Sequence, residues 1–312
     1  MRGGMSRPDA PVLAQTPLVM RTTGWDDYGL VDSGGGRKLE RYGGFSVVRP
    51  EPQCLWRPSL SDEDWEGADA VFDPEGEEDA GRWRFSGATP EARWPLAWRG
   101  VRFYGRFTAF RHLGFFPEQA ANWEWLDGQV RAMGGQPGAD GPPRILNLFG
   151  YTGAASLVCA AAGASVTHVD ASKRAVGWAR ENAELSGLSA APVRWLVEDA
   201  RKYLQREARR GSQYDGIILD PPKYGRGPNG EVWRLYEDLP ELMRLCAELL
   251  SPDARFLLAN VYAERISGLA AGSLMRDCLS GRGGSIDWGE LALIEEARGM
   301  GVGLSFFARW TA

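Results

Sequence analysis

The sequence predicts an α/β protein with a doubly wound, mostly parallel, seven-stranded sheet and a small β-rich domain before it. Residues 145–261 alternate short apolar runs with longer segments of helical periodicity, the pattern of parallel strands joined by crossover helices. Residues 28–111 instead show short β-type runs separated by glycine-rich turns. The length of 312 residues accommodates one large and one small domain.

The first part of the chain predicts a tail followed by the small domain. Residues 1–20, rich in Pro, Gly and Arg, are expected to form a flexible tail, and residues 21–113 the β-rich domain. Within it, "YGLVDSGGGRKLERYGGFSVVRP" has apolar runs around Gly34–Gly36 and Gly43–Gly44, the arrangement of consecutive hairpins. The run at 62–79 holds ten acidic residues and no Lys or Arg, so we expect a surface loop there.

Residues 114–312 predict the larger domain, which we expect to begin with a helix whose first turn contains Pro117. The expected strands of the parallel succession cover 145–149, 165–169, 193–197, 215–219 and 254–261. The expected helices between and after them cover 153–163, 172–186, 199–209, 232–250 and 264–280. Two further strands, near 288–294 and 304–310, are expected to form an antiparallel edge.

Composition restricts the functional classes. The formal net charge of −5 gives no overall attraction to nucleic acid or to an anionic membrane, although a local basic cleft is compatible with it. The four cysteines lie far apart without metal-binding spacing, so we expect buried thiols and no metal site. No segment approaches the ~20 apolar residues of a membrane-spanning helix. These features predict a cytoplasmic protein and make no prediction of its oligomeric state.

Four predicted strand ends carry residues suited to ligand binding. In open α/β sheets, ligands bind at the carboxyl ends of the strands, near the point where the strand order reverses. The four ends read Phe149-Gly150-Tyr151-Thr152-Gly153, then Asp170, then Glu198-Asp199, then Asp220-Pro221-Pro222-Lys223-Tyr224. Asp170 follows Gly150 by 170 − 150 = 20 residues, the distance at which an acidic residue meets a pair of ribose hydroxyls.

A nicotinamide dinucleotide fits the same strand, turn and acid, so the first two strand ends leave the cofactor open. The turn lacks GxGxxG, and the chain lacks a phosphate-binding GxxxxGK[ST] loop. Glu198-Asp199 suits an adenine amino group, and the prolines after Asp220 leave backbone carbonyls free to accept from a substrate amino group. Asp170 and Asp199 are also favourable helix N-caps, a purely structural alternative.

The segments "NLFGYTGAAS", "VDASKRAVGWARENAELSGL", "VEDARKYL" and "DGIILDPPKYGRG" occur in this order. Together they resemble the successive motifs of class I S-adenosylmethionine-dependent methyltransferases, in particular the bacterial large-subunit ribosomal RNA methyltransferase group. The resemblance covers about residues 115 to 262, and "GFFPEQ" at 114–119 is similar to the lead-in segment of that group. It implies a Rossmann-like fold, S-adenosyl-L-methionine as cofactor and a ribosomal RNA substrate.

Residue by residue, the resemblance implies a cofactor site in which Asp170 takes the ribose hydroxyls and Asp199, with Glu198 beside it, the adenine amino group. Asp220 and Pro221 would face the transferred methyl group. The residues implied on the methionine side of the cofactor are Phe149, Gly150, Tyr151, Thr152 and Gly153. Those implied to flank the ribose or close over the pocket are Ser172, Lys173, Phe116 and Gln119.

The reaction is predicted from what the strand ends lack. Methylation of a pyrimidine carbon needs a cysteine nucleophile, and neither "DPPKYG" nor "FLLANVY" contains one. Asn260 stands there instead, resembling relatives that methylate a guanine ring nitrogen, and Tyr224 is a candidate for stacking on a splayed base. We therefore expect methylation of an RNA base nitrogen. A small-molecule or protein acceptor, a dinucleotide-dependent oxidoreductase and a non-catalytic binding module remain alternatives.

A basic helix face is a second candidate for RNA contact. Its members fall on the helix expected over 199–209 or directly after it: Arg201, Lys202, Arg206, Arg209 and Arg210. Such a face is most often a solvated surface.

Overall fold

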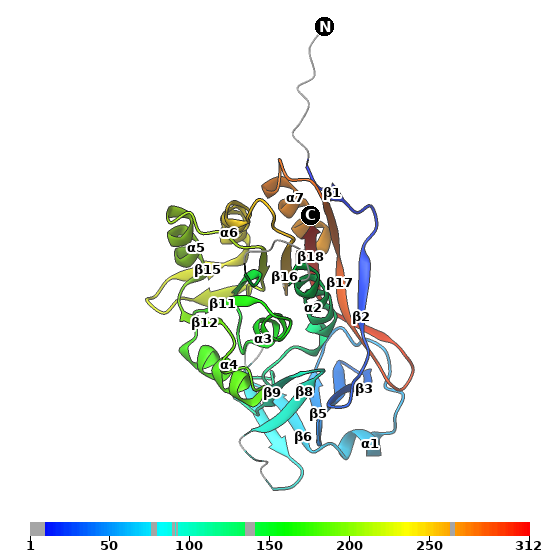
Figure 1. Cartoon of the computed structure of the whole chain (residues 1–312). Helices are drawn as coiled ribbons and strands as arrows, with labels where there is room; N and C mark the ends of the chain where they lie inside the picture. The colour runs from blue at the N-terminus through cyan, green and yellow to red at the C-terminus, as the bar shows by residue number, and fades with distance from the viewer. Residues whose placement is uncertain (1–9, 76–79, 89–90, 92, 135–140, 263–265) are drawn as a thin grey trace.

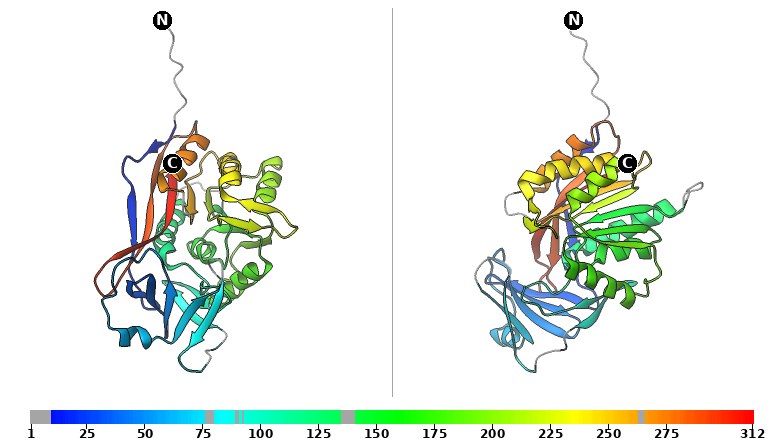
Figure 2. Two further views of the ribbon diagram at one scale, coloured as in Figure 1. Left: turned by 180° about the vertical axis from the view of Figure 1, so that it is seen from behind. Right: turned by 90° about the vertical axis from the view of Figure 1, so that its left-hand side faces the viewer.

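The computed structural model describes residues 10–75, 80–88, 91, 93–134, 141–262 and 266–312. A mixed nine-stranded sheet forms its centre (Figures 1 and 2). Seven of its strands have the order β12-β11-β10-β13-β16-β18-β17, and the chain reverses direction across the sheet between β10 and β13. The predicted Rossmann-like fold is confirmed by this order and by the structural relatives described below.

The parallel part of the sheet has the strands that apolar runs predict. They are β10 (Arg144–Leu148), β11 (Ser165–Asp170), β12 (Val193–Val197), β13 (Gly216–Leu219) and β16 (Phe256–Val261). Every residue of β13 and β16 is buried, as expected for central parallel strands covered on both faces. The strands β17 (Ser285–Ile294) and β18 (Gly301–Thr311) are antiparallel to each other, and β18 is antiparallel to β16, as predicted.

Helices cover both faces of the sheet (Figure 2). On one face lie α2 (Ala120–Gly134), α3 (Ala154–Ala161) and α4 (Lys173–Leu185). On the other lie α5 (Ala200–Arg209), α6 (Leu235–Leu249) and α7 (Gly268–Cys278), which share a large apolar core with the sheet. A short 3-10 helix, η1 (Pro117–Gln119), precedes α2 and has Pro117 in its first turn.

The start of the described chain is part of the sheet, which was not predicted. Strands β1 (Val12–Leu13) and β2 (Leu18–Thr22) both pair in parallel with β17. The expectation of a flexible tail over 1–20 is therefore wrong for residues 12–13 and 18–20, and residues 1–9 lie outside the described chain. Alternation of half-buried and exposed side chains along β2 is the signature of an edge strand with one covered face.

A second sheet forms the β-rich region near the N-terminus. Its strands β3 (Tyr28–Gly34), β4 (Arg37–Tyr42) and β5 (Phe45–Pro50) form the predicted consecutive hairpins. The strands β6 (Ala70–Pro74) and β7 (Gly81–Phe85) complete this sheet, and β8 (Trp94–Trp98) pairs with β9 (Val101–Gly105). One apolar core joins this region to α3 and α4, so the two parts pack as one body.

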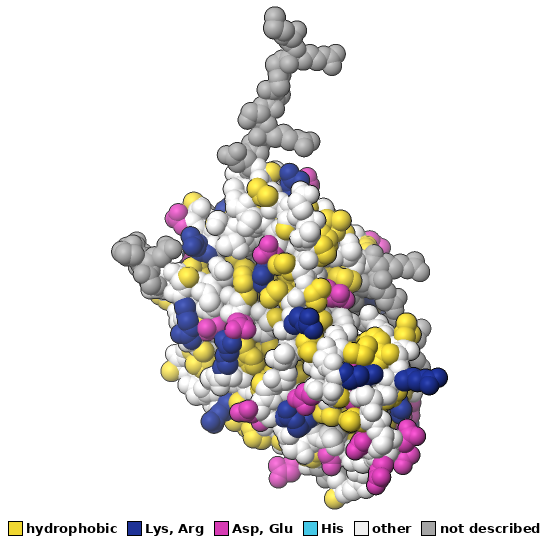
Figure 3. Space-filling view, turned by 90° about the vertical axis from the view of Figure 1, so that its right-hand side faces the viewer, with side chains coloured by type: hydrophobic (Ala, Val, Ile, Leu, Met, Phe, Trp, Pro, Cys, Tyr) yellow, Lys and Arg dark blue, Asp and Glu magenta, His cyan; other side chains and the backbone are white. Residues whose placement is uncertain are grey.

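The acidic run at 62–79 is more ordered than the expected loop. It contains a short helix, α1 (Asp62–Glu66), and the strand β6, while residues 76–79 lie outside the described chain. Ser61 caps α1 through a reciprocal capping box with Asp64. Acidic side chains gather over this region at the lower end of Figure 3.

Candidate functional site

The carboxyl ends of β10 and β13 lie side by side at the point where the strand order reverses. The turn after β10 has an unusual backbone: Phe149 and Tyr151 have positive φ values of 56° and 49°, and Gly153 has 86°. Left-handed conformations of residues other than glycine are costly and concentrate at functional sites. The turn then leads into α3, whose N-cap Gly153 provides no side-chain hydrogen bond to the helix.

Two glycines are required by the packing of this turn. A Cβ atom on Gly150 would lie 2.4 Å from Cε1 and 2.5 Å from Nδ1 of His168, and one on Gly153 would lie 2.9 Å from Cβ of Ala179. His168 is fully buried, and burial lowers its pKa to about 3. Its Nδ1 lies 3.0 Å from the Ser156 hydroxyl. A neutral imidazole therefore forms the floor beneath the turn.

Asp170, at the end of β11, is joined to this turn by backbone hydrogen bonds. Its Oδ2 accepts from the backbone N–H of Tyr151 at 2.9 Å and its Oδ1 from that of Ser172 at 2.8 Å. Burial raises the pKa of the carboxyl, while these two bonds lower it. Ser172, not Asp170, is the N-cap of α4, and Lys173 beside it is exposed.

The third strand end has structural partners of its own. Asp199 is the N-cap of α5 and accepts from the backbone N–H of Lys202 at 2.9 Å. Glu198 forms a bidentate ion pair with Arg206, and its backbone N–H donates to the backbone carbonyl of Asp170 at 3.0 Å. The backbone of Glu198 therefore adjoins that of Asp170, and the capping alternative is realised for Asp199 only.

The fourth strand end carries a carboxyl group held by side-chain amides. Asp220 accepts from Nδ2 of Asn260 at 2.9 Å and from Nε2 of Gln119 at 3.3 Å. Burial raises its pKa to about 7, against the lowering effect of the Asn260 bond, and the nearby charge of Glu118 raises it further. This carboxyl therefore exchanges a proton near neutral pH, which is the property of a general base.

Two residues of this site were missed from the sequence. The hydroxyl of Tyr262 donates to Oε1 of Glu118 at 2.8 Å and accepts from Nε2 of Gln119 at 3.1 Å. Glu118 is 4% exposed and precedes Gln119 in η1. The available signals in the sequence were an acid one position before a predicted site residue and a tyrosine two positions after Asn260.

Aromatic side chains connect the two halves of the site. The ring of Phe116 lies 5.7 Å from that of Tyr151 and 5.4 Å from that of Tyr262 between centroids. Phe149 packs at 5.0 Å against Trp233. Phe116 therefore bridges the turn after β10 and the Asp220 network.

Tyr224 lies apart from these groups, on a hairpin that the sequence did not predict. The strands β14 (Tyr224–Arg226) and β15 (Val232–Arg234) occupy the expected polar loop and the expected first turn of α6. Trp233 is buried on one face, where its Nε1 donates to the Pro222 carbonyl at 2.7 Å. Because side chains alternate along strands, Tyr224, Arg226 and Arg234 share the opposite face, and all three are exposed.

The basic face of α5 is largely neutralised by neighbouring acids. Four of its five cations are paired, in the pairs Arg201–Asp238, Lys202–Glu231, Arg206–Glu198 and Arg210–Glu207. These pairs leave little net charge to attract a phosphate backbone. We therefore interpret this face of the helix as a solvated surface.

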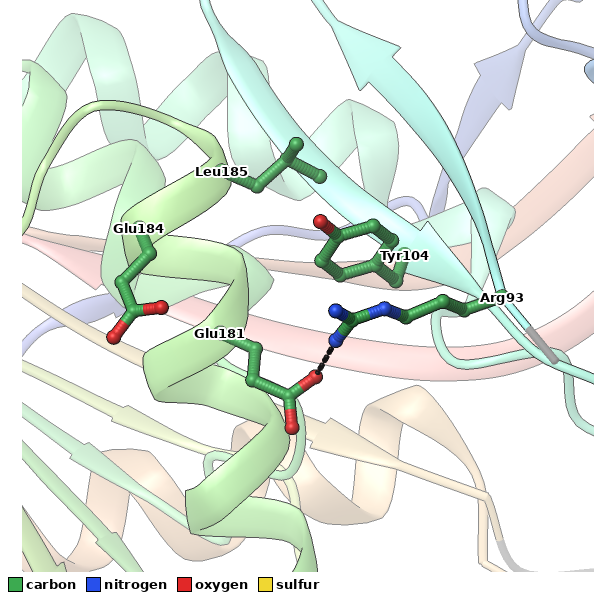
Figure 4. Close-up of a pocket in the computed structure, with 5 residues that line it drawn as sticks. All are labelled: Arg93, Tyr104, Glu181, Glu184 and Leu185. Carbon is green, nitrogen blue, oxygen red and sulfur yellow. Dashed lines mark hydrogen bonds and ion pairs between the residues drawn. The ribbon is translucent and has the colours of Figure 1, made fainter.

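A shallow pocket elsewhere is lined by Arg93, Tyr104, Glu181, Glu184 and Leu185 (Figure 4). The Arg93 guanidinium lies 4.3 Å from the Tyr104 ring centroid and pairs with Glu181 at 2.5 Å. Glu181 also pairs with Arg106. These charges are satisfied by one another, and we interpret the cluster as the junction between β9 and α4.

Within the described ranges, no three His, Cys, Asp or Glu residues gather as a metal site, and no helix is long and apolar enough to cross a membrane. The cysteines match the expectation of buried thiols in three cases, Cys54, Cys159 and Cys246, while Cys278 is partly exposed.

Comparison with known proteins agrees with this geometry. A family model of S-adenosylmethionine-dependent methyltransferases matches residues 68–268. The crystal structure of the SAM-dependent methyltransferase from Agrobacterium tumefaciens is 49% identical, covers 99% of this chain and 97% of its own, and superposes with a TM-score of 0.92.

Two curated relatives carry names that specify a substrate. Ribosomal RNA large subunit methyltransferase K/L of Shewanella frigidimarina is 35% identical over 163 residues, which are 52% of this chain and 21% of that protein. Ribosomal RNA large subunit methyltransferase I of Aeromonas salmonicida is 28% identical over 167 residues, 53% of this chain and 39% of that protein. The chain thus spans between a fifth and two fifths of their length.

The sheet order and the similarity to a solved methyltransferase define a Rossmann-like methyltransferase. The chain belongs to the S-adenosylmethionine-dependent methyltransferase family, and its cofactor is S-adenosyl-L-methionine. This membership decides against the dinucleotide-dependent oxidoreductase.

Proposed function

We propose that this enzyme methylates a base nitrogen of RNA, with ribosomal RNA as the substrate class. The observation that carries the proposal is Asp220, a carboxyl held by two side-chain amides, with a pKa of about 7. It suits a reaction in which an N–H group must lose its proton as the nitrogen gains a methyl group. An exposed face with one tyrosine and two arginines follows it in the chain.

The residues around the turn after β10 fit S-adenosyl-L-methionine, and we call them the donor side: Phe149–Gly153 and Asp170. The uncapped N-terminus of α3 offers backbone N–H groups to the methionine carboxylate. Each Asp170 oxygen accepts one backbone bond, which leaves lone pairs for the ribose hydroxyls. Glu198 and Asp199 are assigned to the adenine amino group, with Ser172 and Lys173 beside the ribose. When bound, the cofactor supplies an electrophilic methyl group on a sulfonium.

We call Asp220, Asn260, Gln119, Glu118 and Tyr262 the acceptor side. Asp220 and the Pro221 carbonyl are assigned to the acceptor N–H group, Asn260 orients Asp220, and Phe116 and Gln119 close over the methyl group. The nitrogen already carries a lone pair, so it needs orientation and no covalent catalyst. Consistent with this, Cys246 is buried in the interior of α6 and does not lie at a strand end.

The hairpin supports RNA over a protein or small-molecule acceptor. Tyr224 is 51% exposed and presents a flat surface on which a base extracted from its helix stacks. Arg226 on the same face suits a phosphate contact, whereas Arg234 is already paired with Glu237 at 3.1 Å. The names of the curated relatives point to the same substrate class, and the proposal places the reaction in the cytoplasm.

The test is transfer of a labelled methyl group from S-adenosylmethionine to RNA extracted from cells that lack this gene. Label is expected in an N-methylated nucleoside after digestion and mass spectrometry. Protein and small-molecule fractions of the same cells are assayed in parallel. Label confined to those fractions, or found on a pyrimidine carbon, would overturn the proposal.

A variant without cysteines separates the two chemistries. Transfer by this variant is expected to stay within a few-fold of the wild type, apart from stability lost at emptied core sites. A covalent adduct with 5-fluorocytosine RNA that disappears when one cysteine is replaced would show carbon methylation instead.

A further inference from the structure

Two carboxyl groups face each other through a short chain of hydrogen bonds on the acceptor side. Glu118 accepts from the Tyr262 hydroxyl at 2.8 Å, and that hydroxyl accepts from Nε2 of Gln119 at 3.1 Å. The same Nε2 lies 3.3 Å from Oδ2 of Asp220. Glu118 has no assigned part in binding either substrate, yet it is buried at considerable cost for a carboxyl group.

We propose that Glu118 is a positioning residue that acts through Tyr262 and Gln119 to keep Asp220 able to accept the acceptor's proton at neutral pH. This inference rests on the proposed function, because it concerns the base of that reaction.

The surroundings of Glu118 favour its ionised form more than those of Asp220 do. Burial raises the pKa of Glu118, but the Tyr262 bond and the cations Lys38 and Arg49 lower it. These cations lie on β4 and β5 of the N-terminal β-rich region. Among the residues that the structure describes, the pKa of Asp220 is set by burial, which raises it, by the Asn260 bond, which lowers it, and by the charge of Glu118, which raises it. A negative charge on Glu118 therefore raises the pKa of Asp220.

The cations beside Glu118 belong to a buried cluster that is balanced without it. Arg49 forms two 2.7 Å bonds to Glu40, and Lys38 lies 3.6 Å from Glu51 and 3.9 Å from Glu40. Two cations thus face two anions. An ionised Glu118 is an additional negative charge, which is tolerated because the cations stabilise it and Tyr262 donates to it.

The remaining polar groups near η1 do not replace this arrangement. On β2, Thr22 donates its hydroxyl to the Glu118 carbonyl at 3.2 Å, and Arg21 is exposed. On β17, Asp287 pairs with Arg309 at 3.6 Å, and Glu290 lies against Gly303 of β18. The phenol of Tyr42, whose pKa is raised by burial, faces Glu118 in its neutral form.

Asp220 is the proton acceptor of the methyl transfer in this arrangement. Asp220 accepts the proton that the acceptor nitrogen loses, while the nitrogen forms its bond to the methyl carbon and the bond from that carbon to sulfur breaks. The sulfonium becomes a neutral thioether, and the positive charge leaves as the proton on Asp220. A carboxylate with an ordinary pKa would be a far weaker base at neutral pH.

The test is carbon-13 NMR of the full chain labelled at aspartate side chains, without cofactor or acceptor. The Asp220 resonance is assigned by its loss in Asp220→Asn. In Glu118→Gln and Tyr262→Phe the proton affinity of Asp220 is expected to fall by about tenfold. The first change removes the negative charge of Glu118, and the second removes the hydroxyl that stabilises this charge. Glu124→Gln removes an exposed charge of α2 and serves as the matched control, with no change expected. Thermal unfolding verifies that each variant is folded.

An Asp220 titration in Glu118→Gln that coincides with the wild type would overturn the inference. The rising limb of methyl transfer with pH should also move to lower pH in both variants, with S-adenosylhomocysteine affinity within about twofold of the wild type. The NMR titration contains no acceptor, so it decides the role of Glu118 even if the acceptor proves not to be RNA. Failure of this inference and failure of the proposed function are therefore distinguishable.

Discussion

Asp170 on the donor side ends β11 and Asp220 on the acceptor side follows β13, the two strands that flank β10, yet the two carboxyl groups are held in different ways. Backbone N–H groups hold both oxygens of Asp170, whereas side-chain amides of Asn260 and Gln119 hold those of Asp220. Backbone contacts fix a geometry once the turn has formed. Side-chain contacts, in contrast, let neighbouring residues adjust the proton affinity of the carboxyl group.

The largest effect is expected from removing the acceptor-side carboxyl. Asp220→Ala should lower methyl transfer by about 10²- to 10⁴-fold, the contribution of a positioned general base. Its affinity for S-adenosylhomocysteine, measured by calorimetry, should stay within a few-fold because the donor side is unchanged. Equal losses of S-adenosylhomocysteine affinity and of methyl transfer would contradict the separation into a donor side and an acceptor side.

The same carboxyl should reduce stability at high pH. Its folded pKa of about 7 lies above the ordinary aspartate value of 3.8, so stability falls as pH rises between these values. Asp220→Asn removes that cost and should raise the free energy of unfolding by about 2–4 kcal/mol at pH 8 and by little at pH 4. Urea unfolding at both pH values measures the difference, and an equal gain at both would contradict the titration.

On the donor side, Asp170→Ala should weaken cofactor binding by about 1–3 kcal/mol, the scale of lost charge-assisted hydrogen bonds. Calorimetry with S-adenosylhomocysteine measures this change. Asp277→Ala, at an exposed acid of α7, is the control and should bind as the wild type does. An unchanged cofactor affinity in Asp170→Ala would contradict the assignment of Asp170 to the ribose hydroxyls.

The smallest effect concerns the hairpin beside the acceptor side. Arg226→Ala should weaken RNA binding modestly and reduce the slope of log affinity against log salt by about 1. Arg209→Ala, on the face of α5 whose other cations are paired, should change it less. A larger effect from Arg209→Ala would indicate that RNA binds to α5 instead of the hairpin.

The succession of strands along the chain and their acidic ends followed from the sequence, because central parallel strands are continuous apolar runs and the acids come directly at or after the ends of these runs. The β14–β15 hairpin did not, since it is anchored by packing of Trp233 on Phe149 and by a bond to the Pro222 carbonyl. Glycine, proline and charge in "KYGRGPNGE" indicate only a loop.

The residues of the acceptor side were likewise predicted from the sequence only in part. Asn260 and Asp220 were predicted at strand ends, and the structure joins them by a 2.9 Å bond. Glu118 and Tyr262 were not, because their contact spans 144 residues and depends on how η1 packs against the end of β16. A capping box was visible in "SDED", and reading it would have predicted α1 inside the acidic run.

The pairing of β1 and β2 with β17 has a consequence for how the chain acquires its structure during synthesis. Val12 is opposite Ser285, so this strand pair forms only after 285 − 12 = 273 further residues have been made. Until then, the first described segment has no partner, and afterwards it covers one side of β17 that would otherwise be open to pairing with another molecule. Completion of the sheet is therefore a late event, and the earliest part of the chain performs it.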